Sequence, residues 1–279
     1  MDQPTVGILH PGSMGAAVAA CATRNAADVL WCEAGRSPAS AQRADLAGLT
    51  PVATLDELLD TSDIVISLCP PAAAEDLAHE VAEHRFTGVY VEANAINPER
   101  SQRIAALLEP TATVVDGGVV GSPPTGGKTP TLYLSGPVHA TTAVEKLFIG
   151  ADVHTKVLGG EVGQASALKL SYAAFQKASR VLVALSTGLA RHHGVDQELL
   201  AVAAKRQDSY LSEPEYVAKA AARAWRWGPE MNEVGDALED AGLPPDLLRA
   251  AAVTLARWDE AKDDHKLTLA DALDRLAQP

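Results

Sequence analysis

The feature that most constrains the fold is a glycine-containing turn at residues 7–15, which read G-I-L-H-P-G-S-M-G. A hydrophobic strand precedes the turn, and the small side chains of residues 16–22 predict a helix after it. In such a turn Gly12 lets the backbone approach a ligand, and Gly15 lets the helix pack close to the strand. Because the free N–H groups at a helix start bind anions, the turn predicts a pyrophosphate site. The predicted cofactor-binding residues of this turn are His10, Pro11, Gly12, Ser13, Met14 and Gly15.

The fingerprint of dinucleotide-binding turns is G-x-G-x-x-G, and His10 stands in the place of its first glycine. A tight strand-to-helix turn without a ligand gives the same two-glycine pattern. The residues after the turn favour the nucleotide-binding interpretation, because strand-like and helix-like segments alternate over roughly half of the chain. Strands are predicted at residues 28–32, 64–69, 89–91, 113–115 and 131–135, and helices at residues 40–46, 55–59, 73–83 and 98–108.

The predicted strands are apolar on both faces, which is typical of a parallel sheet covered by helices on each side. We therefore predict an α/β Rossmann-type domain with a doubly wound, mainly parallel sheet and the glycine turn at its carboxyl edge. This NAD(P)-binding domain is assigned to residues 1–158, and residues 159–279 are predicted to form an all-α domain for substrate binding and dimerisation. Helices of the second domain are predicted at residues 164–193, 197–205, 215–227, 231–241, 245–259 and 269–276.

Composition narrows the class of protein further. A chain of 279 residues with 47% hydrophobic residues can build two domains with real cores. Its net charge of −13 argues against nucleic acid and anionic membranes as partners. Neither a membrane-spanning segment nor a signal peptide is evident, so we expect a cytoplasmic protein with a small-molecule substrate. Cys21, Cys32 and Cys69 lack C-x-x-C spacing, so we predict buried thiols and no metal site.

The choice between NADP and NAD is expected to depend on the loop after the second strand. Glu33 lies where an acid would bind the ribose 2′-hydroxyl of NAD, whereas Arg36 and Ser37 are the residue types that bind a 2′-phosphate. Since no other task for Arg36 and Ser37 is evident in a tight loop, NADP is the predicted cofactor, with NAD possible. The alternative is that Arg36 is a solvated loop arginine.

Five ordered motifs resemble the β-hydroxyacid dehydrogenases related to 6-phosphogluconate dehydrogenase. Besides the turn at Gly12, they are residues 67–71 (S-L-C-P-P), 92–98 (E-A-N-A-I-N-P), 116–122 (D-G-G-V-V-G-S) and 163–169 (G-Q-A-S-A-L-K). The block at residues 116–122 is similar to the substrate-loop motif D-x-P-V-S-G-G of that family, and the last block to its catalytic motif G-x-G-x-x-x-K. The L-H-P-G start and the segment 225–227 (W-R-W) are similar to a branch with a variant helical C-terminal domain.

The resemblance implies reversible hydride transfer between a nicotinamide and the carbinol or carbonyl carbon of a small acid, in which the protein supplies a proton and binds the substrate. It implies Lys169 as general acid and base, since a lysine at a domain junction can exchange a proton with an alkoxide. Lys177 shares its helix face and is the rival. The family pattern also implies a homodimer with interlocked helical domains. It adds Cys69, Pro70, Pro71 and Asn94 to the predicted cofactor-binding residues.

Three positions depart from the family. Val120 replaces the substrate-binding serine, Tyr172 replaces the asparagine after the lysine, and Pro229 replaces a lysine. These changes argue against a short 3-hydroxy acid and favour a substrate that is bulkier, less anionic or held by other groups. Asn94 has the alternative role of a helix cap, and Trp227 that of core packing. The predicted substrate-binding residues are Val120, Gly121, Ser122, Tyr172, Gln176, Trp227 and Glu230, and residues 121–128 are interpreted as a substrate-side loop.

Two other functions remain open. Imine reductases share this architecture but usually carry aspartate or tyrosine in place of the lysine, so here Tyr172 would be the proton donor. A nucleotide-binding regulatory protein that has lost its chemistry is the third hypothesis, since fold does not define function. Such a protein would bind NADPH without reducing any carbonyl or imine.

Overall fold

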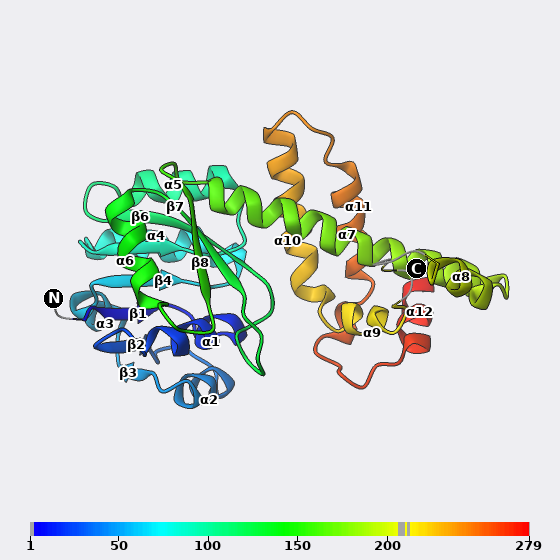
Figure 1. The fold of residues 1–279 in the computed structure, drawn as a ribbon, viewed down its shortest axis with the longest axis horizontal. Helices are drawn as coiled ribbons and strands as arrows, with labels where there is room; N and C mark the ends of the chain where they lie inside the picture. Colours follow the sequence, from blue (N-terminus) through cyan, green and yellow to red (C-terminus); the bar gives the residue numbers. More distant parts are fainter. Residues whose placement is uncertain (1–2, 206–209, 211–212, 279) are drawn as a thin grey trace. The chain divides into compact units, whose positions relative to one another are not determined.

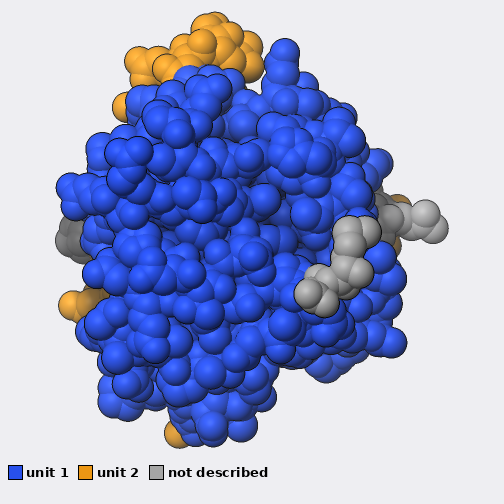
Figure 2. Space-filling model, turned by 90° about the vertical axis from the view of Figure 1, so that its left-hand side faces the viewer, with its two compact units in different colours: residues 1–169 blue, residues 170–279 orange. Residues whose placement is uncertain are grey.

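The computed structural model describes residues 3–205, 210 and 213–278, and the chain divides into two compact units. Unit 1 is Met1–Lys169 and unit 2 is Leu170–Pro279 (Figure 2). The division falls within helix α7 (Gln164–His192), whereas the predicted boundary lies after residue 158.

Unit 1 contains an eight-stranded sheet with the order β3-β2-β1-β4-β5-β6-β7-β8 (Figure 1). Strands β1 to β6 are parallel, β7 is antiparallel to β6, and β8 is parallel to β7. This arrangement confirms the predicted mainly parallel, Rossmann-type fold. The strands are β1 (Thr5–Ile8), β2 (Asp28–Cys32), β3 (Thr50–Val52), β4 (Ile64–Ser67), β5 (Val89–Glu92), β6 (Thr113–Val120), β7 (Thr131–Ser135) and β8 (His154–Gly159).

Helices cover both faces of the sheet, as expected for strands that are apolar on each side. The apolar side chains of α1, α2 and α6 join one buried cluster, and those of α3, α4 and α5 join the other. The helices of this unit are α1 (Ser13–Ala22), α2 (Pro38–Leu46), α3 (Leu55–Thr61), η1 (Pro71–Ala73), α4 (Ala74–His84), α5 (Pro98–Leu108) and α6 (Val138–Leu147).

Three elements of unit 1 escaped the sequence prediction, namely β3, β8 and α6. Strand β3 has only three residues and includes Pro51, and β8 is largely exposed, so neither shows a buried apolar run. Strand β6 also extends beyond the predicted residue 115. Its polar and glycine residues continue the strand because they pair with β7, for example Asp116 with Ser135.

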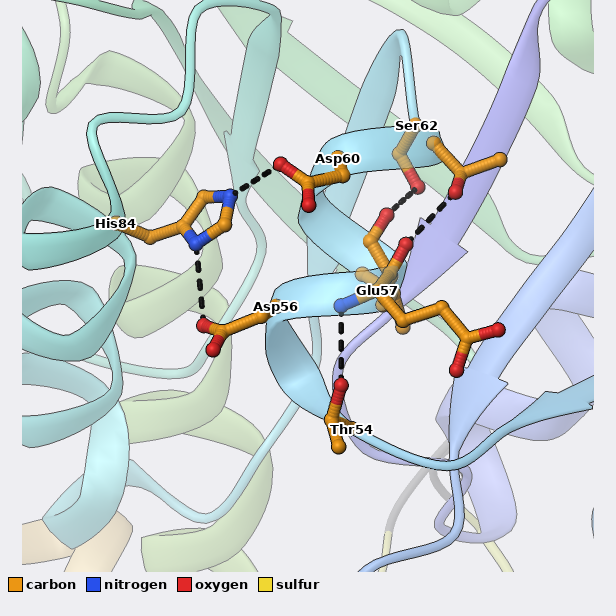
Figure 3. Close-up of polar contacts among 8 residues, drawn as sticks. Thr54, Asp56, Glu57, Asp60, Ser62 and His84 are labelled. Carbon is orange, nitrogen blue, oxygen red and sulfur yellow. Dashed lines mark hydrogen bonds and ion pairs between the residues drawn. The ribbon is translucent and has the colours of Figure 1, made fainter.

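Local polar contacts join α3 to α4 (Figure 3). The Thr54 hydroxyl accepts a hydrogen bond from the Glu57 N–H and so caps the start of α3. At the end of α4, the two ring nitrogens of His84 lie 3.1 Å from an Asp56 oxygen and 3.0 Å from an Asp60 oxygen. Asp56 and Asp60 are exposed, so these contacts join α3 to α4 at the surface and contribute little to stability.

The regular elements among the described residues of unit 2 are all helices, in agreement with the prediction. Its core includes the fully buried Trp258, whose indole N–H donates to the Ala272 carbonyl at 2.8 Å. Besides most of α7, the helices are α8 (Asp196–Ala203), α9 (Tyr216–Ala221), α10 (Ala224–Asp240), α11 (Asp246–Ala256), η3 (Asp259–Ala261) and α12 (Leu269–Ala277).

Two helices were predicted at residues 215–227 and 231–241, and the predicted position of the break between them is wrong. The break lies between α9 and α10, and α10 runs through Pro229 without ending there. An interior proline costs a helix about 3 kcal/mol. Burial of Trp227, Met231 and Val234 on one face of α10 offsets this cost. The sequence prediction ended the helix near the proline because it did not include this burial.

Two composition-based expectations can be compared with the structure. Cys32 is a buried thiol as predicted, whereas Cys21 and Cys69 are only partly buried. No helix within the described parts of the chain combines the length and the apolar character needed to cross a bilayer.

Candidate functional site

The glycine turn joins β1 to α1 and has the predicted close packing. A Cβ atom at Gly15 would lie 2.2 Å from the His10 carbonyl oxygen, so only glycine fits there. Gly12 is the N-cap of α1, and no side chain caps this helix start. The first N–H groups of α1 are therefore left without a side-chain cap, as a site for a phosphate group requires.

His10, which replaces the first glycine of the fingerprint, contacts an arginine from the next loop. Arg36 Nη1 donates to His10 Nδ1 at 3.1 Å, and Arg36 Nη2 donates to the Leu9 carbonyl at 2.8 Å. Burial lowers the pKa of His10, and the charges of Arg36 and Arg43 lower it further. A neutral imidazole results, with Nδ1 able to accept the bond from Arg36.

Arg43 of α2 was not predicted as a site residue, yet it holds the same turn. Its Nε donates to the Pro11 carbonyl at 3.1 Å, and its Nη2 donates to the Ser40 hydroxyl at 3.0 Å. Arg36 lies in the loop before α2 and Arg43 within that helix, so no helical spacing in the sequence relates the two residues. Two guanidinium groups therefore lie beside the glycine turn.

The expectation that Arg36 and Ser37 have no other task is wrong. Arg36 supports the turn, and the Ser37 hydroxyl caps α2 by accepting the Ser40 N–H at 3.3 Å. The Nε atom of Arg36 is nevertheless buried and has no hydrogen-bond partner among the described residues. Glu33 is exposed in the same loop, so both the acid and the arginine lie within this part of the site.

Asn94 connects the loops that follow β4 and β5. Its Oδ1 accepts the Cys69 N–H at 2.5 Å, and its Nδ2 donates to the Ser67 hydroxyl at 2.9 Å. The alternative that Asn94 caps the next helix is wrong, because Asn97 does so by accepting the Arg100 N–H at 2.8 Å. Asn94 is buried, whereas the neighbouring residues of the β4 loop, Cys69, Pro70 and Pro71, are partly or fully exposed.

Asp116, expected to begin a substrate loop, is instead a buried residue of β6 that caps α7. Its Oδ2 accepts the N–H groups of Gly163 and Ser166 at 2.9 and 3.0 Å, and its Oδ1 accepts the Ser166 hydroxyl at 2.5 Å. The Ser135 hydroxyl donates to Asp116 at 2.9 Å and accepts the Ala165 N–H. The carboxylate thus ties the start of α7 to the sheet.

Lys169 lies on the first turns of α7, directly over β6. A Cβ atom at Gly118 would lie 2.7 Å from the Ala165 carbonyl oxygen and 3.1 Å from the Cβ of Lys169. Gly118 therefore allows the helix to approach the strand closely. Lys169 is half-buried, and its place is defined by the cap at Asp116 and by this close packing.

The predicted substrate loop begins where β6 ends. Val120 is partly buried and pairs with Thr131, and Gly121 adopts a φ of 126°, which favours glycine. Ser122 is exposed. The three residues lie two to four positions beyond Gly118 in unit 1, so the same strand end carries them and the contact with Lys169.

In unit 2 the rival lysine has a structural partner. Lys177 forms a buried ion pair with Glu230 and lies 5.8 Å from the ring centre of Trp227. Trp227 belongs to the core of this unit, as the packing alternative expected. Tyr172 is exposed and Gln176 is partly exposed. Trp227 and Glu230 are therefore buried within unit 2.

Arg180 is a second buried cation of unit 2, and it was not predicted from the sequence. Its guanidinium group lies 4.1 Å from the ring centre of Tyr210 and 3.8 Å from that of Tyr216, and its Nη2 donates to Glu213 at 3.0 Å. An arginine three residues after Lys177 carries no motif by itself, and only the fold brings the tyrosines to it.

Within unit 1, the carboxyl ends of the parallel strands bring together the glycine turn, the Arg36 loop, the Asn94 contacts and Lys169. Such an edge is where open α/β sheets bind ligands. Within the described residues, no group of three or more His, Cys, Asp or Glu side chains is arranged to hold a metal ion.

Two protein families match parts of the chain. Residues 1–105 match the family described as D-isomer specific 2-hydroxyacid dehydrogenase, NAD binding domain, and residues 190–258 match a domain of unknown function, DUF1932. An uncharacterized 28.5 kDa protein of Methanothermus fervidus is 26% identical over 175 residues. That match covers 63% of this chain and 66% of the relative, just under two thirds of its length.

Solved structures share the fold over nearly the whole chain. The 3-hydroxyisobutyrate dehydrogenase of Mycobacterium tuberculosis is similar with a TM-score of 0.77 and 18% identity, over 99% of this chain and 100% of that chain. A reductive aminase from Aspergillus terreus, solved with NADPH, is similar with a TM-score of 0.61 and 17% identity, over 98% and 99% of the two chains. At these identities the likeness concerns the fold.

Proposed function

We propose a reaction for this chain, whose fold is similar to that of a 3-hydroxyisobutyrate dehydrogenase and whose residues 1–105 match a 2-hydroxyacid dehydrogenase NAD-binding domain. The chain is an NADP(H)-dependent oxidoreductase that transfers hydride between the nicotinamide and a carbonyl or hydroxyl carbon of a small hydroxy-acid-like substrate. The observation that carries the proposal is the position of Lys169 over Gly118, at the same sheet edge as the uncapped glycine turn.

The residues present fit a dinucleotide. Gly15 lets α1 pack closely on the turn, Gly12 adds no side chain over its backbone, and the α1 start has N–H groups to donate. Cys69, Pro70, Pro71 and the Asn94 contacts would line the nicotinamide side. When bound, the nicotinamide gives or takes a hydride, and the protein supplies everything else.

Lys169 is the proposed general acid and base. Its ammonium group donates a proton to the substrate oxygen during reduction, and its neutral form removes one from the hydroxyl during oxidation. The cap at Asp116 and the absence of a side chain at Gly118 hold the backbone of Lys169 in place, so that only its side chain needs to move. Val120, Gly121, Ser122, Tyr172 and Gln176 remain proposed substrate-binding residues. Trp227 and Glu230 were predicted as well, but core packing and the ion pair with Lys177 account for these two residues.

The preference for NADP rests on the two arginines at the turn. Arg36 keeps a buried Nε without a partner among the described residues, and Arg43 adds a second positive charge nearby. A 2′-phosphate would accept bonds from this pair and neutralise part of the charge. Arg36→Gln is expected to weaken NADPH binding about tenfold or more and NADH binding far less, measured by nucleotide fluorescence. An equal loss for both nucleotides would contradict the preference.

The homodimer also remains a proposal. Phe175 and Leu182, two turns apart on α7, are 65% and 52% exposed, and large apolar side chains at such spacing form a face for a partner. A second copy of the chain is the proposed partner, with helical domains interlocked. Light scattering at micromolar concentration is expected to give the dimer mass, and a monomer mass would contradict it.

The first experiment is NADPH consumption by wild type and Lys169→Ala with keto acids, semialdehydes, neutral ketones and cyclic imines. We expect carbonyl reduction to fall about a hundredfold or more in Lys169→Ala, with NADPH binding retained. Lys156→Ala, which removes an exposed lysine of β8, is the matched control and should keep full activity. Activity that survives in Lys169→Ala would reject Lys169 as the proton donor.

The second candidate function is imine reduction with Tyr172 as the proton donor. It is favoured by the exposure of Tyr172 on α7, three residues after Lys169. Imine reduction that persists in Lys169→Ala and is lost in Tyr172→Phe would assign the chain to this chemistry.

A further inference from the structure

Glu92 is a buried carboxyl group that the proposed reaction does not use. It ends β5, and the sheet register pairs it with Ser67 of β4 on one side and Asp116 of β6 on the other. Its side chain has no exposure to solvent. Oε1 accepts the Asn94 N–H at 3.0 Å, whereas Oε2 has no hydrogen-bond partner among the described residues.

The groups around Glu92 do not favour a negative charge. Asp116 of β6 is a second carboxyl beside it, and Tyr90 of β5 has a fully buried hydroxyl without a partner in the described chain. Cys69 of the β4 loop has a thiol whose pKa is raised to about 11. Arg100 of α5 is a nearby cation, but it forms an ion pair with Glu75. Burial and Asp116 raise the pKa of Glu92 to about 8, against the bonds from Asn94.

We propose that Glu92 is an uncharged carboxylic acid that positions the cofactor-binding loops through Asn94. One oxygen of Glu92 holds the Asn94 backbone, and the Asn94 side chain holds Cys69 and Ser67 at the end of β4. This role rests on the proposed function, since these loops are the proposed nicotinamide side of the site. Glu92 contacts neither substrate nor cofactor, so it is a positioning residue.

Glu92 makes cofactor binding depend on pH. Folding raises the pKa of Glu92, so its neutral form contributes stability that is complete at acidic pH and is lost as the pH rises through about 8. Above that pH an ionised Glu92 would repel Asp116 and withdraw from its apolar surroundings. The connection through Asn94 would then loosen, and NADPH would bind more weakly.

The test is NADPH binding by fluorescence between pH 6 and 9.5 for wild type, Glu92→Gln and Glu92→Ala. Wild type is expected to lose about tenfold in affinity above pH 8. Glu92→Gln, which is neutral at every pH and keeps the oxygen that Asn94 needs, should bind as wild type does at pH 7 and show no such loss. Glu92→Ala should bind weakly throughout. Glu83→Gln, at an exposed position of α4, should keep the wild-type pH profile.

Two results would overturn the proposal, namely a pH profile of Glu92→Gln equal to that of wild type, or an affinity of Glu92→Gln as low as that of Glu92→Ala at pH 7. Thermal unfolding of the same variants separates this failure from failure of the proposed function. A Tm advantage of Glu92→Gln over wild type that grows as the pH rises toward 8 and levels off above it supports the uncharged acid. If no variant binds NADPH at any pH, the proposed function and the cofactor role of Glu92 are both rejected.

Discussion

The two units bury charged side chains in different ways. In unit 1 the Asp116 carboxylate accepts bonds from two backbone N–H groups and from the hydroxyls of Ser135 and Ser166. In unit 2 Lys177 and Glu230 neutralise one another. The first charge is stabilised by backbone and hydroxyl dipoles, whereas the second arrangement includes an opposite charge.

The difference indicates what each charge does. Donors from β7 and from the first turn of α7 converge on Asp116, so this residue fixes the position of Lys169. An ion pair between α7 and α10 brings little net stability, because the desolvation of both groups cancels much of their attraction. Unit 1 therefore uses its buried charge to place the helix that carries Lys169, whereas the pair of unit 2 joins α7 to α10.

The largest effect is expected at Asp116. Asp116→Ala would leave several buried donors without a partner and should lower the free energy of unfolding by about 4 kcal/mol or more, measured by urea denaturation. Asp116→Asn keeps one acceptor oxygen and should lose less. A loss below about 1 kcal/mol in Asp116→Ala would show that water replaces the carboxylate and that the comparison fails.

The ion pair gives the contrasting prediction. Lys177→Met leaves a buried carboxylate and should cost about 3–5 kcal/mol of unfolding free energy, whereas Lys177→Met with Glu230→Leu should lie within about 1 kcal/mol of wild type. Chemical denaturation of the two single variants and the double variant completes the cycle. If the double variant is no more stable than the single ones, the ion pair stabilises unit 2 more than apolar packing at the same positions does. The contrast between the two units would then fail.

The glycine turn gives the smallest expected effect on stability. Gly15→Ala places a methyl group 2.2 Å from the His10 carbonyl, so the turn must shift, at about 1–3 kcal/mol and with loss of NADPH binding. Gly12→Ala is the matched variant, because its methyl group meets only the His10 side chain at 3.1 Å. Gly12→Ala should lose clearly less stability and less NADPH affinity than Gly15→Ala. Equal losses would mean that helix packing at Gly15 does not shape the site.

The N-terminal unit was easier to predict than the C-terminal unit, for physical reasons. Parallel strands are buried on both faces, so apolar runs such as residues 28–32 mark them clearly, and the glycine turn marks the sheet edge. The exposed β8 and the three-residue β3 lack that signal. In unit 2 the helical period was evident, but the effect of Pro229 was not, because its cost is offset by burial that depends on the partners of α10.

The site shows the same division between local and tertiary information. By itself, the sequence determined the glycine turn, the alternation that forms a mainly parallel sheet, and the order of motifs that ends at Lys169. These depend on neighbours in the chain, through backbone freedom and the period of apolar residues. The tertiary structure alone decided that Arg36 bonds to His10 and Arg43 to Pro11, that Asp116 caps α7, and that Glu92 lies between two strands. Those contacts join residues far apart in sequence, and only the packing of the sheet and helices brings their charges and donors within hydrogen-bonding distance.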